Sequence, residues 1–144
     1  MGLGLRKLNL IKMTIIESTT DINLPVAQVY NFLADLNNHQ QLMPENIYNW
    51  SSTADEASFT IQNMAKLAIK ISSRIPDQEL IAVPTEKAPF DLELKWTVAD
   101  NGHGGTTAKH ILSADLNMMM KMLAAGPLQK LVDHETSRLK EVLG

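Results

Sequence analysis

The sequence predicts an α+β domain in which a curved antiparallel sheet wraps one long C-terminal helix. The stretch from Asn117 to Gly144 is the longest with helical periodicity, and its apolar residues recur three, four and seven positions apart. They are Leu128, Leu131, Val132, Leu139 and Val142. Six or seven candidate strands precede this helix, separated by Pro, Gly, Asn and Asp. A helix with one apolar face must bury it, and a curved sheet is an economical cover.

The composition narrows the class of protein. A length of 144 residues suits one domain, and 44% hydrophobic with 20% charged residues is typical of a globular chain. The formal charge of -3 leaves no excess of basic residues for phosphates, which argues against a nucleic-acid partner. The chain has no cysteine, which excludes disulfides and thiolate metal sites and favours the cytoplasm. No apolar run approaches the roughly 20 residues of a membrane span, so we expect a soluble protein.

The domain is expected to begin near Met13, because the first strand pattern starts there. We expect residues 1–12 to be an N-terminal extension and residues 13–144 to form a single domain. The alternative for the extension is an amphipathic helix with Leu5, Leu8 and Ile11 on one face.

A strand followed by two short helices opens the predicted domain. From Thr14 to Ile22 the chain is rich in Ile and Thr, with Ile16, Ser18, Thr20 and Ile22 on one face. Pro25 is suited to the start of a helix. An apolar stripe follows at helical spacing, formed by Val26, Val29, Tyr30, Leu33 and Leu36. A second short helix is predicted from His39 to Met43, ending before Pro44.

The middle of the chain predicts strand after strand. They are expected near Ile47 to Thr53, Ala57 to Asn63, Ala65 to Ile75, Gln78 to Val83, Phe90 to Ala99 and Thr106 to Leu116. Two of them alternate plainly between apolar and polar residues. Their apolar faces are Leu67, Ile69, Ile71 and Ile75 in one strand, and Phe90, Leu92, Leu94, Trp96 and Val98 in the other. In the final helix, Asn117 is a candidate cap, and Gly126-Pro127 should kink or restart the helix between Met118 to Ala125 and Leu128 to Val142.

Several of these segments carry a resemblance to a known family. Ile22-Asn23-Leu24-Pro25, followed by Val29 to Asp35, resembles the opening of the START and Bet v 1-like superfamily, in particular its polyketide cyclase/dehydrase-like (SRPBCC) members. Gly104-Gly105-Thr106 and the interruption at Gly126-Pro127-Leu128 are similar to the C-terminal part of this family's sequences. The resemblance implies a helix-grip fold with an apolar cavity that binds lipids, sterols, polyketides or other hydrophobic molecules. The chain departs from it at His39 to Pro44, where relatives carry tryptophans.

One histidine is the main candidate for chemistry. His110 shares the parity of Ala108, Leu112 and Ala114 on the last strand, which places it on the expected inner face. An inward imidazole can act as an acid or base or orient a polar ligand group. The alternative is a hydrogen-bonded core histidine or one that faces solvent. The run Asp133-His134-Glu135 does not predict a metal site, because neighbours on a helix point about 100° apart. We expect neither a metal nor a cofactor.

The sequence therefore predicts a protein that binds or transports a hydrophobic small molecule or lipid without catalysis. The expected ligand contacts are Tyr30, Trp50, Phe59, Ile69, Ile71, Leu92, Leu94, Trp96, His110, Met119, Met122 and Leu128. Met119 and Met122 are expected to pack against the sheet, since flexible thioethers suit a deformable cavity wall.

Two other functions remain open. The first is a cyclase or dehydratase, with His110 or Tyr30 transferring protons, which requires two polar side chains to converge in the cavity. The second is a protein-interaction module with an exposed apolar patch and a filled cavity. Self-association is also left open.

Overall fold

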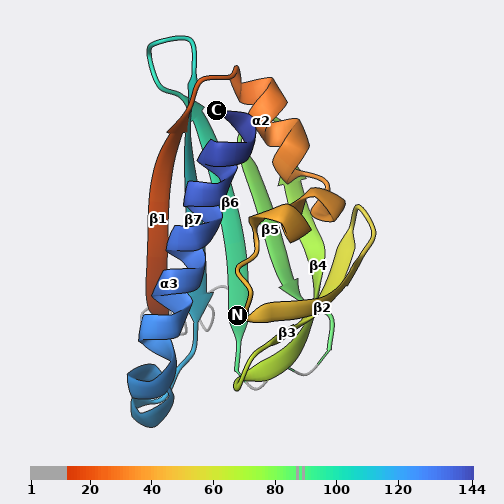
Figure 1. Cartoon of the computed structure of the whole chain (residues 1–144), viewed down its shortest axis with the longest axis vertical. Coiled ribbons are helices and arrows are strands. Elements are labelled where there is room, and N and C mark those ends of the chain that lie inside the picture. Colours follow the sequence, from red (N-terminus) through yellow and green to blue (C-terminus); the bar gives the residue numbers. More distant parts are fainter. Residues whose placement is uncertain (1–12, 87, 89) are drawn as a thin grey trace, which may run out of the picture.

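Seven strands form one antiparallel sheet in the order β1-β7-β6-β5-β4-β3-β2 (Figure 1). The structure is a computed structural model that describes residues 13–86, 88 and 90–144, so the predicted N-terminal extension lies outside the described residues. The strands are β1 Thr14–Ile22, β2 Ile47–Ser52, β3 Glu56–Ile61, β4 Ala65–Ile75, β5 Glu79–Pro84, β6 Leu92–Asp100 and β7 Thr106–Ala114. The helices are α2 Val26–Leu33, the 3-10 helix η1 Leu36–Leu42 and α3 Met118–Leu143.

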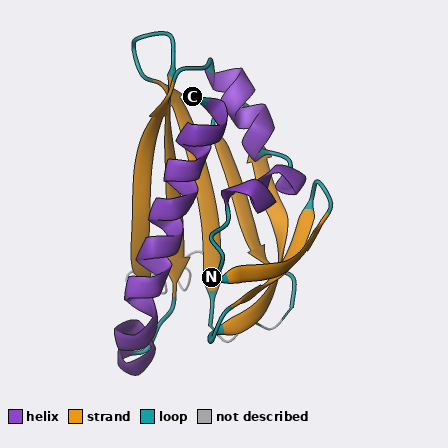
Figure 2. Cartoon of the chain, viewed as in Figure 1, coloured by secondary structure: helices purple, strands orange, loops and turns teal. Residues whose placement is uncertain are grey.

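The sheet curls around α3, and the helices lie on one side of it (Figure 2). Strand β1 pairs with β7, so the first and last strands are neighbours although they stand at opposite ends of the chain. This is the predicted α+β architecture, with two short helices after the first strand and a long C-terminal helix in the grip of the sheet.

The two short helices are separate because Asp35 starts a new one. Helix α2 follows Pro25 and buries Val29, Tyr30 and Leu33. The carboxylate of Asp35 then accepts a hydrogen bond from the backbone N–H of Asn37 at 2.9 Å, which caps η1. The predicted first stripe continued to Leu36, but Leu36 belongs to η1. There Leu36, His39 and Leu42 lie three residues apart and are buried, as the three-residue turn of a 3-10 helix requires.

Strand β4 changes faces at a β-bulge. Its register with β5 shifts between Ile71 and Ser73, so that one extra residue is accommodated there. Before the bulge, Leu67 and Ile69 face the core as predicted. After it, the parity is reversed, and Ile75 is 41% exposed instead of joining the apolar face.

Helix α3 runs without a break from Met118 to Leu143, so the expected restart at Gly126-Pro127 is wrong. Asn117 caps it as predicted, accepting a hydrogen bond from the backbone N–H of Met120 at 2.9 Å. A proline inside a helix removes the hydrogen bond to the carbonyl four residues earlier, which here belongs to Leu123. Leu123 is exposed, so water can satisfy that carbonyl.

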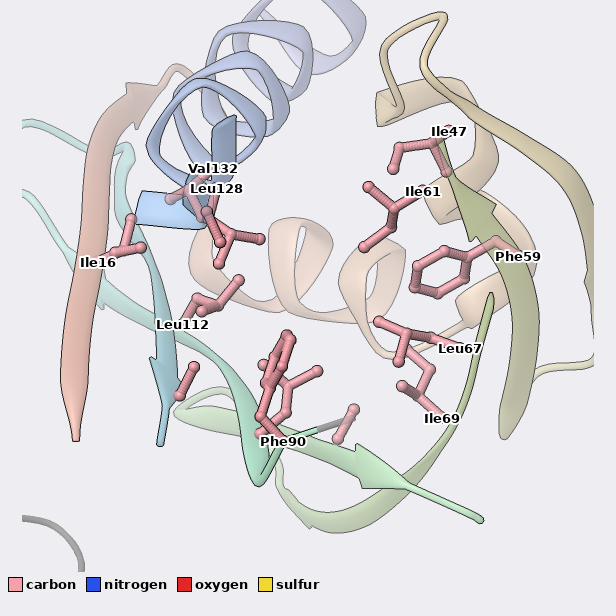
Figure 3. Close-up of a cluster of buried hydrophobic side chains, with 14 of the residues drawn as sticks. Ile16, Ile47, Phe59, Ile61, Leu67, Ile69, Phe90, Leu112, Leu128 and Val132 are labelled. Atoms are coloured by element: carbon pink, nitrogen blue, oxygen red, sulfur yellow. The ribbon is translucent and has the colours of Figure 1, made fainter. Parts of the chain in front are cut away.

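The core lies between the sheet and α3 (Figure 3). Its larger part includes Ile16, Phe59, Leu112, Leu128 and Val132, and a second part lies under α2. The buried stripe of α3 contains Ala124, Leu128, Val132, Glu135, Thr136 and Leu139. Glu135 is therefore a carboxylate on an otherwise mostly apolar face. Among the described helices, none is long and apolar enough to cross a membrane.

Candidate functional site

A small cavity lies between the concave face of the sheet, η1 and α3. Its volume is about 50 Å³, which is room for a few water molecules at roughly 10–15 Å³ each. Its wall is mostly apolar and comes from β2 to β7, η1 and α3. Three of the lining residues are titratable, namely His39, His110 and Glu135.

His110 lies flat against Trp96. The two residues are direct partners in the β6–β7 register, and their ring centroids are 4.3 Å apart with planes 2° from parallel. His110 is 2% exposed. Because the indole covers one face of the imidazole, the stack fixes the plane of the ring.

Glu135 reaches His110 from α3. Its Oε2 lies 3.1 Å from Nδ1 of His110, and both side chains are buried. Nδ1 nevertheless lacks a partner at hydrogen-bonding angles, so the contact is electrostatic rather than a well-aligned hydrogen bond. The other ring nitrogen, Nε2, makes no hydrogen bond with the described residues.

His39 is the third titratable residue of the cavity. Its Nε2 donates a hydrogen bond to the backbone carbonyl of Leu33 at 2.7 Å, and since a carbonyl can only accept, the proton lies on Nε2. Burial lowers the pKa of His39, and the carbonyl of Leu33 and the charge of Glu135 oppose this only in part. His39 is therefore neutral near pH 7.

Eight of the twelve predicted ligand contacts line the cavity. They are Trp50, Phe59, Ile69, Leu92, Leu94, Trp96, His110 and Leu128. Strand parity explains this, since residues of one parity on β6 share the concave face. That these side chains contact a ligand stays a prediction.

Tyr30 and Ile71 lie outside the cavity wall. Tyr30 packs in the core under α2, where its hydroxyl donates a hydrogen bond to the backbone carbonyl of Glu79 at 3.3 Å. Ile71 stands at the bulge of β4 and packs between the two parts of the core.

Met119 and Met122 do not pack against the sheet, so that expectation is wrong. They are 71% and 82% exposed. The side of α3 that turns inward carries Met120, Ala124 and Leu128, each four residues from the next. Met119 and Met122 are off this line, and both face solvent.

The sequence prediction missed Glu135 and His39 as cavity residues. Glu135 had been considered only with its neighbours Asp133 and His134. Its position three residues after Val132 and four before Leu139 places it on the buried stripe, which the spacing could have indicated. His39 could have been found from its spacing of three from Leu36 and Leu42. Within the described part of the chain, no group of three or more metal-ligating residues is positioned to hold an ion.

Known proteins resemble this chain in structure only. No protein-family model and no curated protein matches its sequence. A START superfamily protein from Mycobacterium smegmatis superposes with a TM-score of 0.63 at 13% identity, over 89% of this chain and 98% of that one. Aha1 from Colwellia psychrerythraea, solved as a dimer, gives 0.66 at 15%, over 91% and 96%. The chain has the helix-grip fold.

A third helix-grip structure is larger than this chain. The di-domain ARO/CYC StfQ from the steffimycin biosynthetic pathway gives a TM-score of 0.70 at 8% identity, over 97% of this chain and 53% of StfQ. The resemblance to START and polyketide cyclase-like proteins expected from the sequence is thus confirmed as a shared helix-grip fold. Identities of this size establish the fold alone, so function has to be argued from the cavity.

Proposed function

We propose that this helix-grip protein binds and carries a hydrophobic small molecule in the cavity between its sheet and α3. The observation that carries the proposal is a cavity with a largely apolar wall, to which the buried pair His110 and Glu135 contributes the polar groups. Burial of apolar surface supplies the affinity for such a ligand, and a few polar groups set its orientation.

Ligand entry requires the cavity to expand. Pockets for small molecules usually measure about 300–1,000 Å³, whereas this cavity measures about 50 Å³. Met43, Leu94 and Leu131 line it and are only partly buried, so their side chains have room to turn outward. The helix-grip fold, which the chain shares with the START superfamily protein and with StfQ, typically binds hydrophobic ligands in a cavity, and this supports the proposal.

Native mass spectrometry of freshly purified protein tests the proposal. We expect an extra mass that disappears after denaturation and organic extraction. The variant Ala82→Leu fills the cavity wall and should carry less of it, whereas Ala68→Leu, which adds the same atoms to a residue outside the cavity wall, should carry as much as the unchanged protein. A bare protein that also fails to bind fatty acids, sterols and polyaromatics would contradict the proposal.

A second candidate is an enzyme of the cyclase or dehydratase type. It requires two polar side chains that converge in the cavity, and His110 and Glu135 meet this condition. In a dehydration, Nε2 of His110 would take a proton from the carbon beside a carbonyl and return it to the hydroxyl that leaves as water. Incubation with a β-hydroxy thioester tests it, since the unchanged protein should catalyse the loss of water and His110→Phe should not.

A further inference from the structure

A second hollow lies on the surface beside the cavity. It has a volume of about 320 Å³ and runs between the first half of α3 and the end of β3. Its apolar wall consists of Ile61, Met64, Leu123, Pro127, Leu128 and Leu131. Amide side chains at Asn46, Gln62 and Asn63 complete it. We refer to it as the α3–β3 groove.

The groove and the cavity share part of their walls. Ile61, Leu128 and Leu131 line both. Figure 3 shows Ile61 on β3 and Leu128 on α3 on opposite sides of the apolar cluster. The two spaces are therefore adjacent, and a turn of partly buried Leu131, which lines both, would connect them.

We propose that the cavity and the α3–β3 groove form one site for an elongated molecule with an apolar chain and a single uncharged oxygen group at one end. The chain lies in the groove, and the oxygen group reaches His110. This inference rests on the proposed binding function and names the class of ligand.

The polar end is assigned by the buried pair. His110 is 2% exposed, and its Nε2 makes no hydrogen bond with the described residues, so a ligand hydroxyl, which can donate or accept, has a free partner there. A carboxylate head group is disfavoured because Oε2 of Glu135 lies only 3.1 Å from the same ring. Two carboxylates that share a buried, largely apolar site repel each other strongly when both are ionised.

The length of the ligand follows from α3. Leu123 lines the outer part of the groove, and Glu135 lines the inner end of the cavity, twelve residues later on the same helix. At about 1.5 Å per residue, the two positions are about 18 Å apart along the helix axis. An alkyl chain of roughly a dozen carbons covers most of this span, since each tetrahedral C–C bond advances about 1.3 Å.

Fluorescence titration with three probes tests the proposal. Both tryptophans of the chain, Trp50 and Trp96, line the cavity, so their emission reports occupancy. The probes are dodecanol, dodecanoate and adamantanol, which is compact, carries an aliphatic hydroxyl and does not fluoresce. We expect dodecanol to bind about tenfold more tightly than either of the others, which corresponds to about 1.4 kcal/mol.

A pair of exposed neighbours on α3 gives the matched control. Leu123 lines the groove and is 73% exposed, whereas Met122 is 82% exposed and outside it. Leu123→Asp should weaken dodecanol binding about tenfold. Met122→Asp should leave it unchanged. Neither substitution removes a buried side chain, so both variants should fold.

The outcomes separate this inference from the proposed function. Equal or tighter binding of adamantanol or dodecanoate, or no effect of Leu123→Asp, would overturn the inference while the binding function stands. Failure of every probe to bind would overturn the inference, and the binding function is judged separately by the extracted mass.

Discussion

Trp96 and His110 stack face to face across β6 and β7, with ring centroids 4.3 Å apart and planes 2° from parallel. The stack holds the plane of the imidazole, and Nδ1 lies 3.1 Å from Oε2 of Glu135 on α3. His110 thus makes a polar contact between the sheet and the helix that it grips, at the wall of the cavity.

The first prediction is that His110 and Glu135 are energetically coupled. His110→Phe leaves a buried carboxylate without its partner, and Glu135→Leu leaves a buried ring nitrogen without one. Each should lower the free energy of unfolding by about 1–3 kcal/mol. The double variant should lose less than the two single losses combined, because both polar groups are then gone. Urea unfolding measures all four proteins, and additive losses would show that the contact carries no energy.

The second prediction concerns the pH dependence of stability through His39. Burial lowers its pKa in the folded protein, so below a pH of about 6.5 the unfolded chain binds a proton that the folded protein does not. The stability that comes from a neutral His39 is present above this pH and is lost as the pH falls. The groups facing the ring are Glu135, His110 and Asp35.

Urea unfolding at several pH values below neutrality measures this effect. His39→Gln should flatten the fall in stability on acidification. His103→Gln changes an exposed histidine in the β6–β7 turn and should leave the slope as it is. An unchanged slope in His39→Gln would mean that other groups cause the acid sensitivity.

The third prediction concerns Arg74, which connects β4 to the end of α2 and to the turn between β2 and β3. Its guanidinium donates hydrogen bonds to the carbonyls of Ala34 at 2.8 Å and Ala54 at 3.1 Å and pairs with Asp55 at 2.8 Å. Arg74→Ala should cost about 1–2 kcal/mol, given partial exposure. Amide hydrogen exchange in η1 and in the β2–β3 hairpin should become faster. The control Lys70→Ala, which changes an exposed residue on the same strand, should alter neither the stability nor the exchange rates. Unaltered exchange in Arg74→Ala would contradict this role.

The fourth prediction compares two glycines. A Cβ on Gly105 would lie 2.5 Å from the carbonyl oxygen of Ile22 and 2.8 Å from Nδ2 of Asn101, so Gly105→Ala should destabilise the protein. At Gly126, inside α3, a Cβ meets nothing within 4 Å. Gly126→Ala should therefore stabilise by about 0.5–1 kcal/mol. Thermal unfolding measures both, and a shift of the same sign in the two variants would contradict the packing described around Gly105.

Strand parity was sufficient to predict much of the cavity wall. Leu92, Leu94 and Trp96 alternate along β6, and each faces the cavity. Parity failed at Ile75, because the bulge in β4 inserts a residue that no sequence pattern indicates. Strand parity gives no information about helices. To predict whether Met119 and Met122 face the sheet, one must know which side of α3 turns toward it.

The pairing of His110 with Glu135 shows a second limit. The two residues are far apart along the chain, and their contact depends on how α3 lies in the sheet. The spacing of apolar residues could have placed His110 on the inner face of its strand and Glu135 on the inner face of its helix. It does not reveal that these two residues meet. The α3–β3 groove is likewise a property of packing between elements.

Quenching of Trp96 tests the central claim most directly. Trp96 is 4% exposed and lines the cavity, so a quencher in solution reaches it poorly. In the variant Trp50→Phe, Trp96 is the remaining tryptophan of the chain. The account predicts that a dodecanol carrying a bromine atom on its chain quenches this emission in a saturable titration with one molecule per chain. Quenching that rises without saturation, or none at all, would contradict the assignment of the cavity and the α3–β3 groove as one site for such a chain.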